Sequence, residues 1–119
     1  MKVLLPACSL LVLCACTQPP AQPAGTYRLS MDERSMVLQV RVGGDYILQM
    51  DGPGREADEI RGRWEEEHGA GPNLSFHGIV WRGTEPEAGL GIWAAAQDAD
   101  GSICLGERDL ACFLKDAAG

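Results

Sequence analysis

The sequence contains few of the residues on which most enzymes and nucleic-acid-binding proteins depend. Its 119 residues include only two histidines, and they lack a Gly-x-Ser-x-Gly, a His-Glu-x-x-His and a phosphate-binding glycine motif. Positive charge is also scarce, because 10 Lys and Arg are outnumbered by 17 Asp and Glu, for a net charge of −7. Such a protein repels nucleic-acid phosphates. We therefore expect no enzymatic activity, no cofactor or metal, and no nucleic-acid partner.

The chain also lacks an apolar run long enough to span a bilayer as a helix. Its longest apolar run, Val3–Leu13, follows the positively charged Lys2 and is typical of a secretory signal peptide. The run ends in the tetrapeptide Leu13-Cys14-Ala15-Cys16. This tetrapeptide resembles the lipobox of bacterial lipoproteins, with a cysteine at the position that is usually variable. Conventional signal cleavage after Cys16 is the alternative.

The lipobox resemblance implies a membrane anchor and a division of the chain. Residues 1–15 would be removed as signal peptide, and Cys16 would become the first residue and carry acyl chains such as palmitate. Thr17 follows, where an Asp would favour inner-membrane retention, so we expect the periplasmic face of the outer membrane. Residues 16–25 are proline-rich and predict a tether, which leaves a single domain over residues 26–119.

Few cysteines remain for the folded domain once the signal peptide and the lipidated residue are set aside. Cys8 and Cys14 leave with the signal peptide, and Cys16 takes lipid. Cys104 and Cys112 then remain in an oxidising compartment, which predicts a disulfide between them. A redox-active or metal-binding pair is the alternative, although no Cys-x-x-Cys spacing supports it.

Short alternating segments separated by turn residues indicate an all-β domain. In Met36–Val42, for example, Met36, Leu38, Val40 and Val42 share one face, and the turn Gly43-Gly44-Asp45 leads to a partner strand. We expect a small antiparallel meander barrel or sandwich of about seven or eight strands. The expected strands are 26–30, 36–42, 46–50, 59–66, 74–81, 90–96 and 102–105, with 109–115 as a strand or a helical turn and 82–89 as a polar loop.

Glycine and aromatic residues recur together along the chain, as Gly25-Thr26-Tyr27, Gly44-Asp45-Tyr46 and Gly62-Arg63-Trp64. The rhythm is similar to that of small lipocalin-like bacterial lipoproteins, such as the N-terminal barrel of the copper-resistance and envelope-stress lipoproteins. The resemblance implies a barrel. This chain has Ser30–Glu33 where that family shows Cys-x-x-Cys, so copper binding and stress sensing do not carry over.

Strict alternation leaves three large apolar residues on the outer face of the later strands. If Leu74 and Phe76 face the core, Ile79 and Trp81 point outward, and Trp93 opposes its apolar neighbours in the next strand. An exposed aromatic patch would mark a binding surface. A β-bulge at one of the glycines near these residues, Gly78 or Gly91, is the alternative, since it would return both tryptophans to the core.

Two clusters of acidic residues complete the candidate sites. Glu65, Glu66 and Glu67 form a carboxylate run, interpreted either as a solvated strand edge or as a contact for a basic partner. Asp98–Ser102 is similar to the start of a calcium loop but has no Glu at the later ligand position, which favours a hairpin turn.

These observations leave two classes of function. We expect a non-enzymatic protein-binding module, such as an envelope-complex subunit, an inhibitor or an immunity factor, that uses Ile79, Trp81 and Trp93 with the carboxylates 65–67. The alternative is a lipocalin-like carrier of a small apolar ligand. Bulky inward residues, including Leu38, Tyr46, Leu48, Trp64 and Phe76, would tend to fill so small a barrel, which favours the first class.

Overall fold

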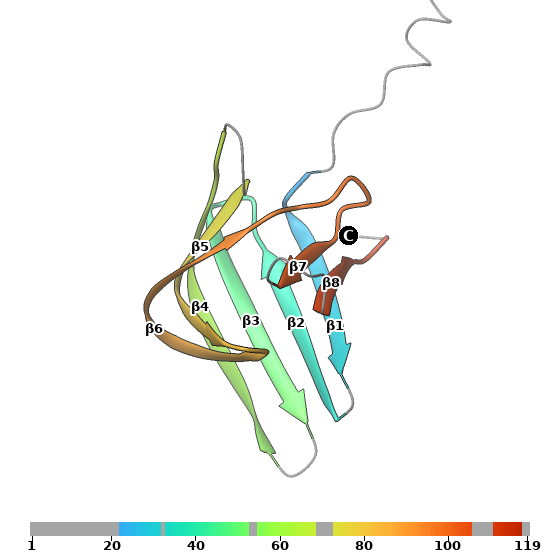
Figure 1. The fold of residues 1–119 in the computed structure, drawn as a ribbon, viewed down its shortest axis with the longest axis vertical. Coiled ribbons are helices and arrows are strands. Elements are labelled where there is room, and N and C mark those ends of the chain that lie inside the picture. Colours follow the sequence, from blue (N-terminus) through green and yellow to red (C-terminus); the bar gives the residue numbers. More distant parts are fainter. Residues whose placement is uncertain (1–21, 32, 53–54, 69–72, 106–110, 118–119) are drawn as a thin grey trace, which may run out of the picture.

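Eight antiparallel strands form one continuous, nearly closed barrel (Figure 1). The computed structural model describes residues 22–31, 33–52, 55–68, 73–105 and 111–117. Along the sheet the strands follow the order β6-β5-β4-β3-β2-β1-β8-β7. Their bounds are β1 Gly25–Met31, β2 Arg34–Val40, β3 Asp45–Gly52, β4 Arg55–Glu66, β5 Leu74–Arg82, β6 Glu85–Ala95, β7 Ile103–Leu105 and β8 Ala111–Lys115. The all-β prediction is confirmed.

Alternation of apolar residues along β1, β2 and β3 builds the core. Leu38 of β2 lies opposite Tyr27 of β1 and Leu48 of β3, and none of the three side chains reaches solvent. Phe76 of β5 and Phe113 of β8 are also fully buried. Because the large side chains of facing strands meet in the middle, the interior of the described barrel is packed with protein atoms.

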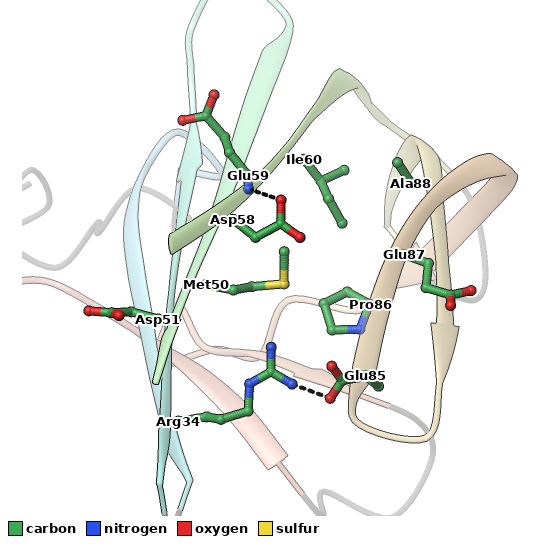
Figure 2. A pocket seen from close by; sticks show the side chains of 10 residues that line it. All are labelled: Arg34, Met50, Asp51, Asp58, Glu59, Ile60, Glu85, Pro86, Glu87 and Ala88. Carbon is green, nitrogen blue, oxygen red and sulfur yellow. Dashed lines mark hydrogen bonds and ion pairs between the residues drawn. The ribbon is translucent and has the colours of Figure 1, made fainter. Parts of the chain in front are cut away.

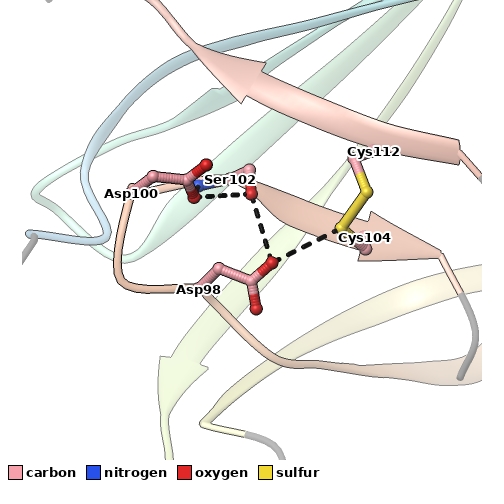
Figure 3. Close-up of a disulfide and its surroundings, with 5 residues drawn as sticks. All are labelled: Asp98, Asp100, Ser102, Cys104 and Cys112. Atoms are coloured by element: carbon pink, nitrogen blue, oxygen red, sulfur yellow. Dashed lines mark hydrogen bonds between the residues drawn. A yellow bond between two sulfur atoms is a disulfide. The ribbon is translucent and has the colours of Figure 1, made fainter. Parts of the chain in front are cut away.

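Pairing of the first and last strands joins the C-terminal β7–β8 hairpin to the rest of the sheet. β8 pairs with β1 through Tyr27 and Lys115, and it also pairs with β7. Cys104 and Cys112 lie directly opposite each other in the β7–β8 pair and form a disulfide (Figure 3). The predicted disulfide is therefore present. The two cysteines are eight residues apart in sequence, so the disulfide links the two strands of a single hairpin.

Several predicted strand bounds need correction; β2 already begins at Arg34 and β4 at Arg55, for example. Val42 was expected to share the buried face of β2, but that strand ends at Val40, and Val42 is exposed beyond it. Residues 82–89 were expected to form a loop, but β6 already begins at Glu85. The hairpin turn at Gly83, which has a φ of +65°, brings this acidic stretch alongside β5 despite its low strand propensity. In the described part of the chain, no helix is long and apolar enough to cross a membrane.

Candidate functional site

The three apolar residues predicted on the outer face belong to the interior instead. Ile79 is 1% exposed and Trp93 is 7% exposed, while Trp81 is partly buried against the core. The β5–β6 register shifts between His77 and Ile79, and Gly78 at this point has a φ of +94°. The single Gly78 of β5 lies opposite three residues of β6, Gly89–Gly91, and this irregularity interrupts the strict alternation, so that the side chains after it face the opposite way. The outward orientation expected for these residues is wrong, and the bulge alternative holds.

Both inward-facing tryptophans belong to an aromatic cluster in the core. The Trp93 ring stacks on Phe76 with centroids 4.7 Å apart, and Trp81 meets Trp93 edge-on at 5.1 Å. Phe113 of β8 lies 6.0 Å from Trp93. These contacts join β5 and β6 to β8 across the barrel, so the cluster helps to hold the barrel together.

A different set of apolar residues is exposed on the outer surface of β5 and β6. Leu90 is fully exposed, Ile92 is 63% exposed and Val80 is 39% exposed; we call these three residues the β6 strip. A shallow groove of about 300 Å³ runs beside the strip, lined by Val80, Ile92 and parts of Ile79, Trp81 and Trp93. The sequence correctly predicts that Leu90 and Ile92 lie on the other face of the strand from Trp93, but Trp93 is on the inner face and these two residues are on the outer one.

Glycines on either side of Leu90 explain why this leucine is so exposed. A Cβ atom at Gly91 would lie 2.5 Å from the Val80 side chain and 2.7 Å from the Ile79 carbonyl oxygen. Only glycine lets β6 approach β5 this closely as it bends (Figure 1). The Gly89-Leu90-Gly91 sequence is the signal that could have revealed the exposed leucine.

The carboxylate run predicted as a partner contact lies at the end of β4 and just beyond it. Glu65, Glu66 and Glu67 are all exposed. The Glu65 carboxylate approaches Nε2 of His77 only to 4.0 Å, and Glu67 accepts a hydrogen bond of 2.8 Å from the Ser75 hydroxyl. The exposure of these side chains fits a solvated edge as well as a contact surface.

A cleft at the opposite end of β4 was not foreseen from the sequence. It has a volume of about 900 Å³ and opens at the barrel mouth, where β3 and β4 face the beginning of β6 (Figure 2). We call it the mouth cleft. Its lining residues are Arg34, Met50, Asp51, Asp58, Glu59, Ile60, Glu85, Pro86, Glu87 and Ala88.

An ion pair spans the mouth cleft from β2 to β6. The Arg34 guanidinium donates from Nη1 to the Glu85 carboxylate, and its Nε is buried with no hydrogen-bond partner among the described residues. Because the partners are 51 residues apart in sequence, this pair links the two sides of the mouth. The positive charge of Arg34 is thereby neutralised within the cleft.

The remaining carboxylates give the mouth cleft a negative potential. Glu59 and Glu87 are paired with Arg61 and Arg82 on the outer surface. Asp58 instead projects into the cleft beside Met50 and Ile60 (Figure 2), and accepts a hydrogen bond of 2.8 Å from the backbone N–H of Glu59. No cationic side chain among the described residues pairs with Asp58. Asp51 likewise lacks a cationic partner among the described residues but is directed away from the other lining side chains (Figure 2). The cleft therefore combines apolar walls with two unpaired carboxylates, of which Asp58 is the one that points inward.

The segment that was compared with a calcium loop folds as a turn held together by its own side chains (Figure 3). Asp100 accepts hydrogen bonds from the backbone N–H and the hydroxyl of Ser102, and these bonds lower the pKa of the Asp100 carboxyl group. Within the described ranges, no group of three or more His, Cys, Asp and Glu residues is arranged to hold a metal ion.

The predicted lipidation residue Cys16 and the cleavage site before it lie outside the described residues. Comparisons with known proteins found no match to a protein-family model, to a curated protein or to a solved structure. The β6 strip and the mouth cleft are therefore interpreted from their own geometry and chemistry.

Proposed function

We propose that this chain is a lipid-anchored lipoprotein at the periplasmic face of the outer membrane and that it acts as a non-enzymatic protein-binding module. The β6 strip is the observation that carries the binding role. Two of its side chains are more than half exposed, and they lie beside a groove on the terminal strand of the sheet. Apolar side chains grouped beside a groove are typical of protein contacts, because burying them removes apolar surface from water.

The packed interior favours this proposal over a carrier of small apolar ligands. Carriers of the lipocalin type hold their ligand in a cavity inside the barrel. Here the centre is occupied by Tyr27, Tyr46, Phe76 and Phe113, each with no exposed surface. The mouth cleft is lined by charged residues, which suits a polar contact better than an apolar ligand.

The anchor in this proposal comes from the lipobox resemblance at Leu13–Cys16 and from the short sequence that links it to β1. Acyl chains on Cys16 would keep the barrel near the membrane surface. The module would then present the β6 strip to other proteins of the envelope.

Affinity capture with a matched control tests the proposal. Full-length tagged protein, solubilised from envelopes, should copurify with a partner in near-stoichiometric amount. The double variant Leu90→Ser/Ile92→Thr should lose most of that partner, whereas Leu114→Ser, which changes another exposed leucine, should retain it. Both variants should keep the stability of the wild type to within about 0.5 kcal/mol, because they alter exposed side chains. Equal capture by all three proteins, or a small apolar molecule found bound by native mass spectrometry, would contradict the proposal.

A further inference from the structure

The mouth cleft and the β6 strip are neighbouring parts of one surface. Glu85, Pro86, Glu87 and Ala88 at the beginning of β6 line the cleft, and Leu90 follows two residues later on the same strand. Val80 of the strip lies directly opposite Glu87 in the strand register. A protein that covers the strip would therefore also reach the cleft.

The charges in the cleft indicate which kind of side chain it accepts. Five of its lining residues are carboxylates, and the only cationic one, Arg34, is paired with Glu85. Asp58 is the carboxylate that projects inward without a cationic partner among the described residues. Met50, Ile60 and Pro86 supply apolar walls beside it (Figure 2). A lysine or arginine side chain has the matching chemistry, with an apolar stem and a cationic head.

Resting on the proposed protein-binding function, we infer that the partner is a basic protein whose apolar residues cover the β6 strip while a lysine or arginine side chain enters the mouth cleft and pairs with Asp58. Charge complementarity selects this occupant over a second copy of the same chain. Two copies would bring together acidic clefts on molecules in which Asp and Glu outnumber Lys and Arg. A membrane surface rich in anionic lipid would be repelled for the same reason.

Photo-crosslinking in living cells tests where the partner docks. A photo-crosslinking amino acid, p-benzoylphenylalanine, is placed in the full-length lipoprotein at Leu90, and at Leu114 as the matched exposed control. We expect an adduct from position 90 whose partner peptide contains lysine or arginine, and little or none from position 114. An adduct with twice the mass of the chain would show a second copy instead and would overturn the inference.

Substitutions in the acidic residues test the role of the cleft. Asp58→Asn keeps a hydrogen-bond acceptor for the backbone but removes the charge, and should reduce the adduct at position 90 at least about fivefold, the effect of losing about 1 kcal/mol. Glu66→Gln is the matched control, because it makes the same charge change eight residues along β4, about 26 Å away. An effect of Glu66→Gln without one of Asp58→Asn would favour the 65–67 carboxylate run and overturn the inference.

The outcomes separate this inference from the proposed function. If affinity capture finds a partner but position 90 gives no adduct, or Asp58→Asn has no effect, the surface is wrong and the binding role remains. If neither capture nor crosslinking finds a partner, both proposals fail. A partner with a net negative charge would refute the inferred chemistry even if it docked at the strip.

Discussion

Gly62 lies where a side chain has no room. A Cβ atom at this position would come within 2.1 Å of the His77 carbonyl oxygen and 2.8 Å of the Tyr46 ring. Gly62 lies opposite Tyr46 in the register of β3 and β4, and the Tyr46 hydroxyl donates a 2.8 Å hydrogen bond to that same His77 carbonyl. The tyrosine side chain thus passes over the glycine and ties β3 to β5. This explains why the Gly62-Arg63-Trp64 sequence begins with a glycine.

Gly62→Ala should destabilise the fold by about 1–3 kcal/mol, because the strands would have to move apart to accept the methyl group. Urea unfolding followed by tryptophan fluorescence measures the loss. Gly43→Ala is the matched control, since the nearest atom to its Cβ would be 3.7 Å away. If both variants unfolded at the same urea concentration, the packing described for Gly62 would be wrong.

Two buried tyrosines should make the fold less stable at alkaline pH. Burial raises the pKa of Tyr46 to about 12, and burial also raises that of Tyr27 to about 12 despite its hydrogen bond to Gln97. The unfolded chain releases these protons near pH 10. The two protonated tyrosines therefore make their full contribution to the free energy of unfolding below about pH 10, and this contribution is lost as the pH rises toward 12.

We expect the urea midpoint to fall between about pH 10 and pH 12, and the fall to be smaller in Tyr46→Phe, which has one fewer group to ionise. At neutral pH this variant should lose about 0.5–1.5 kcal/mol, because the bond to the His77 carbonyl is gone. A midpoint in Tyr46→Phe that fell with pH as steeply as in the wild type would count against Tyr46 as a source of the effect.

Most strands were predictable because their turns and their alternation agree. The 43–45 turn and the alternating residues before it sufficed for the β2–β3 hairpin. The beginning of β6 was not predictable in the same way, because its Glu-Pro-Glu sequence has low strand propensity and is held by pairing with β5. The mouth cleft also escaped prediction, because its lining comes from four different strands.

The candidate surface was harder to predict than the strands, because the irregularity at Gly78 reverses the orientation of the side chains that follow it in β5. Before Gly78, alternation correctly placed Leu74 and Phe76 in the core; after it, every expectation pointed to the wrong face. The sequence shows that a glycine is present but not that it adopts a positive φ. The sequence therefore predicted correctly which strands Ile79, Trp81 and Trp93 occupy, but not that their side chains face the core.

The β7–β8 hairpin depends on its disulfide more than the longer strands depend on any single bond. β7 has only three residues, and β8 has five. The double variant Cys104→Ala/Cys112→Ala should lose about 2–3 kcal/mol in urea unfolding, because its unfolded chain is no longer restricted by the closed loop. Reducing agent should lower the wild type to the same level and leave the variant unchanged. A reductant effect of equal size on both proteins would show that it acts elsewhere.

At the scale of the whole molecule, a packed acidic barrel is joined to its proposed lipid anchor by a short proline-rich segment. The described barrel needs no membrane contact to bury its core, since its large apolar side chains already meet inside. Membrane attachment would then depend on Cys16 alone.

Cys16→Ser should move the protein from the membrane fraction to the soluble periplasmic fraction and abolish labelling with radioactive palmitate. Cys8→Ser is the matched control, because it removes another cysteine of the N-terminal region without touching the lipobox, and should remain membrane-bound and labelled. A Cys16→Ser protein that stayed in the membrane fraction would disprove the anchor.

The pairing of β1 with β8 also determines when the eight-stranded sheet is completed during synthesis. Each pairing among strands β1 to β6 joins neighbours in sequence, so each of these hairpins can form soon after its second strand has emerged. The free edge of β1 must instead wait for residues almost ninety positions later, since Arg28 pairs with Leu114. Until then the nascent chain exposes an unpaired strand edge, the kind of template from which aggregation starts. Each new molecule therefore stays prone to aggregation until its last strand, β8, has been synthesised and has paired with β1.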